Sequence, residues 1–493
     1  EIFLKAFFNL YFRENLYYMY ELMVVVFVLG YLCITLEHQL KVDKAAVALV
    51  TGILCWTIYV VGKEQIVDLD KVKDHAIHEF SSTYPGEITE TSDESVNDEI
   101  TYETIAEFVT EVQLFEILSE ISSILFFLMG AMTIVEIIDL HGGFRVVTDR
   151  IKTRNKLKLL WIIGIISFFF SAALDNLTTS IIMVSLTRKF IKDQKERWMF
   201  LGMVIISANA GGAWSPIGDV TTTMLWIGKQ ITTQQIILNV FLPSLVCLLV
   251  PLTIMSFYTK GNVERPSDEE NKTAHHTTRQ QRNLVFGLGV SGLIFVPIFK
   301  SLTHLPPFMG MMLSLGVLWL ITDIMHKKDD IKTKRHFSVF HALEKMDVPT
   351  ILFFLGILLA VGSLQSAGQL NQMAGFLDDK IGTSTENGVY LIGSIIGLLS
   401  ALVDNVPLVA AAMGMYPLGG MEFFEQDGLF WEFLAYCAGT GGSALIIGSA
   451  AGVAIMGLEN IPFFWYVRKF TILAIIGYIA GIITYIIQYS ILN

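Results

Sequence analysis

The chain is poor in charged residues and in cysteine, and both shortages narrow its class. Only 16% of its 493 residues are charged, against about 25% in soluble domains, whereas 53% are hydrophobic and the mean hydropathy is +0.56. This balance excludes a soluble enzyme or a nucleic-acid-binding protein and indicates a protein whose partner is the lipid bilayer. The four cysteines all lie in apolar runs, and their spacing fits neither a zinc site nor a disulfide framework.

The apolar segments also lack the residues that intramembrane catalysis would need. They contain neither a nucleophile with a paired base nor a cluster of histidines that could bind a metal. We therefore expect a protein that is not an enzyme and has no resident cofactor.

Runs of about 20 apolar residues, the length needed to cross a bilayer, occur ten times. They lie near 20–37, 42–61, 115–139, 199–228, 236–258, 283–300, 304–323, 349–366, 431–457 and 463–490. Two further apolar stretches, 159–187 and 387–417, are about 30 residues long and are interrupted midway by polar residues. Because loops of similar charge flank each stretch on both sides, the pattern predicts two re-entrant hairpins.

The distribution of charge predicts the orientation. Segment 63–111 holds 14 acids and three lysines, so it accounts for most of the net charge of -12. One assignment places 26 of the 34 basic residues in the cytoplasm, chiefly in 141–158, 188–197, 259–282 and 326–345. Both termini and the acidic loop then face outward.

Internal similarity divides the chain into two halves. LFFLMG at 125–130 recurs as LFFLG at 352–356, SAALDN at 171–176 recurs as SALVDN at 400–405, and AGG at 210–212 recurs as TGG at 440–442. Each half has an odd number of crossings, which predicts inverted repeats. The expected order is an external segment 1–19, a first repeat 20–258 with the acidic loop at 63–113, a cytoplasmic linker 259–282 and a second repeat 283–493.

Polar residues interrupt both hairpins at the same place. Asp175 and Asn176 lie midway along the first, and Asp404 and Asn405 lie midway along the second. A carboxylate at membrane depth needs a partner, water or a proton. An N-cap is the alternative interpretation, but capping does not require an acid in both hairpins. The pair of acids predicts a site for a cation or a proton.

A glycine-rich break follows each hairpin. The first runs from Ser207 to Thr223 and the second from Ala438 to Ser449, where Ser449 takes the place of Asp219. These segments contain carboxylate, amide and hydroxyl oxygens, which are the ligands that hard cations prefer. Close helix packing is the alternative reason for such glycines. The expected cation ligands are Asp175, Asn176, Thr178, Thr179, Asn209, Asp219, Thr221, Thr222, Ser400, Asp404, Asn405, Thr440 and Ser443.

Four motifs in order resemble the NhaD-type sodium/proton antiporters of the ion transporter superfamily: SAALDNLTTSIIM, ANAGGAWSPIGDVTTTM, SALVDNVPLVAAAMGMYPL and GTGGSALIIGSAAGVAIMG. The resemblance covers residues from about 20 to 490. It implies exchange of Na+ or Li+ for H+, and an all-α fold with scaffold and transport domains that moves as an elevator and forms a homodimer. The family is chiefly bacterial and has plastid-envelope relatives in plants, so the resemblance does not settle the compartment. We expect a multi-pass protein of the inner (plasma) membrane, with a plastid envelope as the second choice.

A sodium-coupled dicarboxylate permease or an arsenite permease of the same superfamily is the main alternative. A dicarboxylate site is expected to offer neutral or cationic groups at the hairpin tips, whereas Asp175 and Asp404 repel anions.

The charge distribution yields a test of topology. Single cysteines placed in 63–111 should react with an impermeant thiol reagent added from outside, whereas cysteines in 259–282 or 326–345 should not. The background protein would lack the four native cysteines. Labelling of a cysteine at residue 270 from outside would contradict the inverted arrangement.

Overall fold

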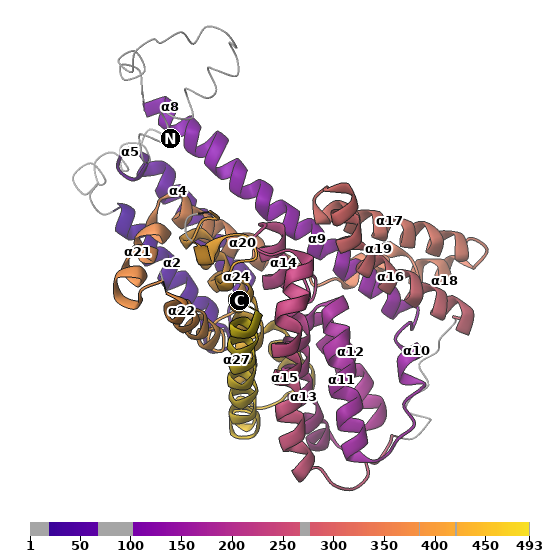
Figure 1. Ribbon diagram of the computed structural model, residues 1–493. Helices are drawn as coiled ribbons and strands as arrows, with labels where there is room; N and C mark the ends of the chain where they lie inside the picture. Colours follow the sequence, from indigo (N-terminus) through magenta and orange to yellow (C-terminus); the bar gives the residue numbers. More distant parts are fainter. Residues whose placement is uncertain (1–18, 68–101, 267–276, 384, 420–421, 493) are drawn as a thin grey trace. The chain divides into compact units, whose positions relative to one another are not determined.

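The computed structural model describes residues 19–67, 102–266, 277–383, 385–419 and 422–492, and this part of the chain is helical without a β-strand (Figure 1). Eight of its helical segments are long and apolar enough to cross a membrane. These are Lys44–Val61, Ile105–Leu140, Lys156–Leu174, Thr233–Tyr258, Arg279–Thr303, Pro307–Met325, Val348–Ser366 and Phe463–Leu492. The prediction of an all-α polytopic membrane protein is confirmed. Most of the acidic loop, 68–101, lies outside the described residues.

The described residues form two compact units. The first takes the chain up to Ser122 together with Pro349–Gly375. Its elements are α2 (Met19–Thr35), α3 (Glu37–Leu40), α4 (Lys44–Val61), α5 (Lys63–Ile66), α8 (Tyr102–Glu107), the π-helix η2 (Phe108–Gln113), the start of α9 (Leu114–Leu140), nearly all of α20 (Val348–Ser366) and the start of α21 (Gln369–Ile381). The indole of Trp56 on α4 donates to the carbonyl of Leu359 on α20 over 2.9 Å.

The second unit, Ser123–Val348 and Phe376–Asn493, contains both predicted hairpins and both breaks. Besides the rest of α9 and α21 it holds α10 (Arg145–Thr148), α11 (Lys156–Leu174), α12 (Asn176–Phe190), α13 (Gln194–Ala213), α14 (Val220–Ile227), α15 (Thr233–Tyr258), α16 (Arg279–Thr303), α17 (Pro307–Met325), α18 (Ile331–His336), α19 (Val339–Lys345), α22 (Glu386–Leu399), α23 (Asn405–Met415), α24 (Leu429–Gly441), α25 (Ala450–Glu459), α26 (Phe463–Tyr466) and α27 (Ile472–Leu492). Short helices η3 (Glu422–Phe424), η4 (Gly442–Ala444) and η5 (Val467–Thr471) join them.

The interruptions in the second unit lie where the polar residues predict them. Asp175 separates α11 from α12, and 400–404 separate α22 from α23. One expectation needs correction, because Gly211 and Gly212 lie inside α13 and do not open it. The break itself is 214–219, around Pro216. A second difference is that α11, with 19 residues, is long enough to cross a membrane by itself.

The glycines serve close packing in both halves. A Cβ on Gly211 would lie 2.1 Å from the carbonyl oxygen of Phe168 on α11, and one on Gly441 would lie 1.9 Å from that of Gly397 on α22. The backbones therefore touch at matching places. A serine hydroxyl reinforces each contact, since Ser171 donates to the carbonyl of Ala208 over 2.5 Å and Ser400 to that of Ala438 over 3.2 Å.

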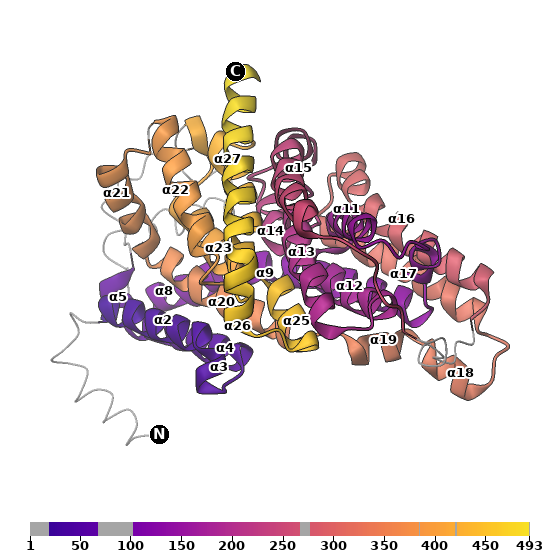
Figure 2. The same ribbon diagram turned by 90° about the horizontal axis from the view of Figure 1, so that it is seen from below.

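Two polar contacts, called tethers here, connect the halves. Each links the end of the helix that follows one break to the region where the helix that precedes the other break begins. In the Glu459 tether, the buried carboxylate at the end of α25 accepts from Arg188 over 2.5 Å and lies 3.1 Å from a guanidinium nitrogen of Arg197. Figure 2 shows α25 beside α12. In the Asp427 tether, the carboxylate before α24 accepts from the backbone N–H of Thr232, after α14, over 2.5 Å.

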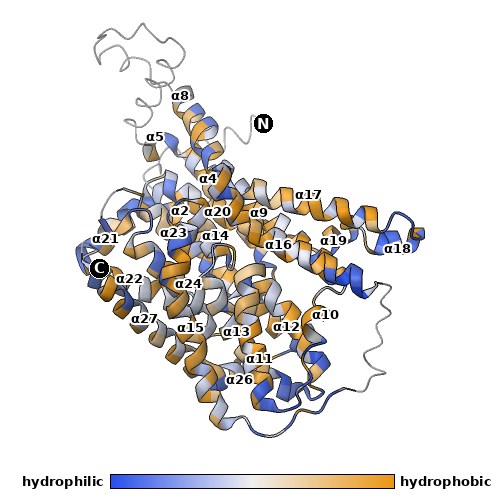
Figure 3. Ribbon diagram, turned by 45° about the vertical axis from the view of Figure 1, so that its right-hand side comes forward, coloured by the Kyte–Doolittle hydropathy of each residue, from blue (hydrophilic) through white to orange (hydrophobic). Residues whose placement is uncertain are grey.

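Hydropathy follows this architecture. The long helices α9, α11, α15 and α17 carry extended hydrophobic stretches, whereas hydrophilic residues gather at α18 and at the loop after α10 (Figure 3). Exposed apolar side chains on these helices, such as Phe169, Leu238 and Leu320, fit contact with lipid.

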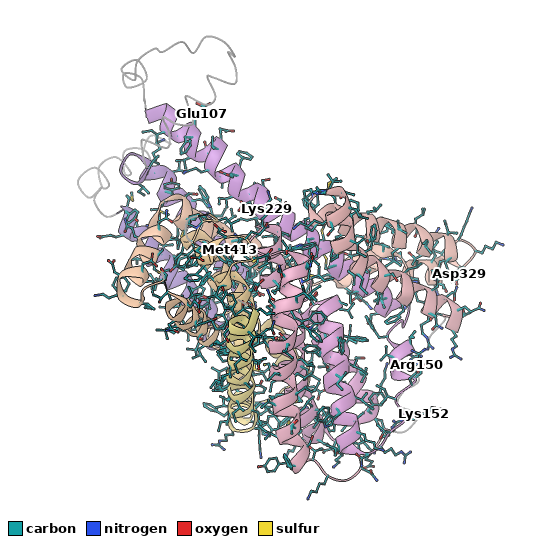
Figure 4. All side chains as sticks on the ribbon, in the orientation of Figure 1. Glu107, Arg150, Lys152, Lys229, Asp329 and Met413 are labelled. Atoms are coloured by element: carbon teal, nitrogen blue, oxygen red, sulfur yellow. The ribbon has the colours of Figure 1, made fainter. Side chains whose placement is uncertain are left out.

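A buried histidine pair joins the ends of α9 and α17. His141 and His326 are 0% and 3% exposed, and their Nε2 atoms are 3.0 Å apart. Nδ1 of His141 lies 2.7 Å from the carbonyl of Ile137, and Nδ1 of His326 lies 2.7 Å from Asp329, in the turn after α17 (Figure 4). Both oxygens accept a hydrogen bond from an Nδ1–H, and the two Nε2 atoms face each other within hydrogen-bond distance.

His141 begins the basic segment 141–158, yet its side chain is buried rather than solvated. Burial lowers the pKa of His141 to about 4, and the neighbouring His326 and His336 act in the same direction. Because the unfolded chain binds this proton from about pH 6.5 downward, stability falls as the pH drops from 6.5 toward 4. His275 and His276 lie outside the described residues.

The first prediction from the fold concerns this pair. Between pH 6.5 and 4.5 the free energy of unfolding should decrease by about 1.4 kcal/mol per pH unit from this residue. His141→Gln should flatten the pH dependence of the unfolding midpoint, measured by intrinsic fluorescence. His304→Asn, at an exposed histidine with a φ of 60° that asparagine tolerates, is the control. Equal pH slopes in the wild type and His141→Gln would contradict the assignment.

A second prediction tests the close packing. Gly211→Ala should cost about 1 to 3 kcal/mol or more, because its Cβ meets backbone that cannot rotate away. Gly457→Ala on α25 should be neutral or slightly stabilising, since nothing lies within 4 Å of its Cβ and alanine favours a helix. Thermal unfolding of both purified variants measures the difference. An equal midpoint for the two would refute the role of Gly211.

Candidate functional site

The first hairpin tip is built around Asp175. Its φ is +72°, a conformation unusual for a residue other than glycine. The carboxylate accepts from the backbone N–H of Thr178 over 2.7 Å and from its hydroxyl over 2.8 Å, so it caps α12. At the second tip Asp404 caps α23 through the N–H of Val406 at 3.2 Å. Both acids therefore perform the capping that was considered as their alternative role, and Asp175 in addition lines a cavity.

Asp219, at the end of the first break, is the meeting point of both hairpins. One carboxylate oxygen accepts from the amide of Asn176 over 3.1 Å, and the other accepts from the amide of Asn405 over 2.9 Å. The hydroxyl of Thr221 donates to the same second oxygen over 2.6 Å. The carboxylate is almost fully buried, with 3% of the residue exposed. Only neutral donors surround it among the hydrogen bonds of the described chain.

Asn209 links this centre to the second break. Its side-chain oxygen accepts from Asn176 over 3.2 Å, and its amide donates over 2.9 Å to the hydroxyls of both Ser443 and Ser449. Asp219 and Ser449 have almost the same backbone conformation, with φ of -146° in both and ψ of 151° and 152°. The two breaks thus present a carboxylate and a hydroxyl from matching positions.

A small cavity of about 10 Å³ connects Asp175 and Asp219, with room for roughly one water. Thr223 lines it together with apolar side chains of α9, α16 and α17, and no basic residue is among those that line it. The nearby hydroxyl of Thr179, on the first turn of α12, is buried and has no hydrogen-bond partner in the described structure. Oxygen atoms of carboxylate, amide and hydroxyl groups are therefore concentrated where the two hairpins meet.

Three other predicted ligands form hydrogen bonds with backbone groups through their hydroxyls. Ser400 donates to Gly397 and Ala438, and Thr440 donates to the carbonyl of Tyr436 over 2.6 Å. The hydroxyl of Thr222 bonds the backbone of Asp219 as both donor and acceptor. The structure thus brings together Asp175, Asn176, Thr178, Asn209, Asp219, Thr221, Asn405 and Ser443, whereas the hydroxyls of Ser400 and Thr440 point to helix carbonyls.

Sequence reasoning missed two buried acids in this unit, Glu459 of the tether described above and Glu432. Glu432 on α24 is 2% exposed and accepts hydrogen bonds from Asn239 and Tyr485. A single glutamate inside the apolar run 429–438 was the signal that could have identified it.

Comparison with known proteins supports the resemblance. A model of the citrate transporter family CitMHS matches residues 24–432. Sodium/proton antiporter 1 of Arabidopsis thaliana is 52% identical over 368 residues, which are 75% of this chain and 62% of that relative's length. Sodium/proton antiporter 2 of the same plant is 44% identical over 465 residues, covering 94% of this chain and 98% of the relative.

A bacterial relative extends the likeness. The Na+/H+ antiporter NhaD of Alkalimonas amylolytica is 32% identical over 404 residues, which are 76% of this chain and 79% of that protein. The motifs, the helical membrane fold and these matches lead to one conclusion: the chain belongs to the NhaD-type sodium/proton antiporter family.

Proposed function

We propose that the protein is a secondary active transporter that exchanges Na+ or Li+ for H+ at the carboxylates between the hairpins. The observation that carries this proposal is the position of Asp219, whose two oxygens receive amide groups from opposite hairpins. The names of the plant and bacterial relatives, which specify sodium and protons, agree with it.

The mechanism rests on the cost of a buried charge. An ionised carboxylate away from bulk water is unfavourable unless a proton or a cation compensates it. Bound Na+ and bound H+ are alternatives at the same oxygens, so each displaces the other. If only the compensated site crosses, an ion moving one way must be followed by the other ion moving back. The amides of Asn176 and Asn405 would then rotate to offer oxygen to Na+ and N–H to an empty carboxylate.

The matched backbones and contacts support a further part of the proposal, which concerns the relation between the two halves. We propose that the halves are inverted repeats, because Gly211 and Gly441, Ser171 and Ser400, and Asp219 and Ser449 occupy corresponding environments. An elevator motion, a homodimer, outward termini and an inner membrane location are proposed from the family resemblance and the charge distribution.

An anion substrate is the second candidate, favoured by the match to the citrate transporter family. Against it, the cavity between the hairpins is lined by Asp175 and Asp219 and by no basic side chain. A dicarboxylate or citrate would meet repulsion there.

The site assignment predicts a graded series of transport defects. In proteoliposomes containing a pH-sensitive dye, Asp175→Asn and Asp404→Asn should each abolish the dissipation of a pH gradient by Na+. Asp219→Asn should raise the apparent Na+ constant by about tenfold or more, and Ser449→Ala by less, because a contact with a charged group is worth about 1.5 to 3 kcal/mol against about 1 for a neutral one.

Na+, Li+, K+, succinate and citrate would be tested separately with the wild type. Full exchange by both Asp175→Asn and Asp404→Asn would remove the hairpin acids from the mechanism. Uptake of succinate or citrate would favour the anion transporter instead.

A further inference from the structure

A second polar cavity lies away from the hairpin tips, between α15, α24 and α27. It has a volume of about 330 Å³, enough for several waters. Three carboxylates line it, those of Glu422, Asp427 and Glu432, and none of its lining residues in the described chain is basic. A polar space lined by this charge attracts cations.

Glu432 is the buried member of this set. The amide of Asn239 contacts both of its oxygens at 2.9 Å, and the hydroxyl of Tyr485 donates to one of them over 3.1 Å. These neutral donors do not compensate a full negative charge. With only 2% of the residue exposed, the carboxylate needs a proton or a cation from the cavity.

An unused acceptor belongs to a residue that also lines this cavity. Gln488 lines the cavity, and its amide nitrogen donates to the carbonyls of Leu238 and Asn239. This fixes the orientation of the amide, yet its side-chain oxygen is buried and has no donor in the described structure. Gln488 and the three carboxylates thus supply neutral and charged oxygens to the lining of one cavity, and oxygen is the ligand that a hard monovalent cation prefers.

We infer that the cavity beside Glu432 is a second binding site for a monovalent cation, in which Na+ and H+ compete. The inference rests on the proposed function for its role in transport. Glu432 precedes Gly441 by nine residues on α24, about 14 Å along the helix axis, and the same helix leads into the break that supplies Ser443. A cation bound at Glu432 lies near the start of α24, and the end of that helix leads into the polar network around Asp219. It would supply Na+ to that centre.

Equilibrium binding of ²²Na+ to the purified full chain tests the inference without transport. At pH 8.5 the wild type should show two classes of Na+ site. Glu432→Gln should remove one class and keep the other, whereas Asp219→Asn should weaken the other by about tenfold or more and keep the class at Glu432. Lowering the pH to 6 should weaken the class at Glu432. A single class in the wild type, or unchanged binding in Glu432→Gln, would overturn the inference.

Two further variants control for folding and for charge. Glu432→Asp keeps the charge but shortens the side chain by one methylene, and it should bind Na+ more weakly than the wild type in the class that Glu432→Gln lacks. Glu422→Gln removes an exposed carboxylate from the same cavity and should change the constant by less than about twofold. Na+ binding by Glu432→Asp equal to that of the wild type would contradict a direct contact.

A transport measurement separates this inference from the proposed function. Glu432→Gln should raise the half-saturating Na+ concentration for exchange by about tenfold, as expected for loss of a charged contact. Absence of exchange in the wild type would refute the proposed function and leave the binding result decisive for Glu432. Exchange with unaltered Na+ dependence in Glu432→Gln would refute the inference and leave the proposed function intact.

Discussion

The second unit is organised around a buried carboxylate that must be satisfied without bulk water. Asp219 obtains its donors from Asn176, Asn405 and Thr221, which belong to three different helices and to both halves of the chain. For these groups to converge, the first turns of α12, α14 and α23 have to lie side by side. The close contacts at Gly211 and Gly441 follow from this, since a side chain at either position would push a hairpin away from the centre.

The two breaks share a backbone and differ in charge. Asp219 and Ser449 begin α14 and α25 with the same conformation, and Asn209 bonds the hydroxyl of Ser449 while accepting from the amide that reaches Asp219. The shared geometry keeps the polar network continuous across the halves. Because only the first break carries a carboxylate, the free-energy cost of a buried charge arises at Asp219 and not at Ser449.

The sequence contained enough information to locate the interruptions between α11 and α12 and between α22 and α23, because a polar Asp-Asn pair inside a long apolar run has few other interpretations. Its repeats also paired Asp219 with Ser449, and these two residues have matching backbone conformations. The sequence could not predict where each hydroxyl points. Thr440 donates to a carbonyl one turn earlier in its own helix, and Ser400 donates to a carbonyl of the neighbouring helix α24, as hydroxyl side chains in apolar surroundings do. His141 and His326 are 185 residues apart, and no local pattern announces their contact.

The Glu459 and Asp427 tethers have a mechanical consequence. Arg188 and Arg197 hold the end of α25 to α12 and α13, while Asp427 holds the segment after α14 to the start of α24. Each break is therefore connected to a helix of the opposite half by a hydrogen bond or an ion pair. A displacement that carried one break without the other would have to separate the buried carboxylate of Glu459 from Arg197, so the two breaks are expected to move together.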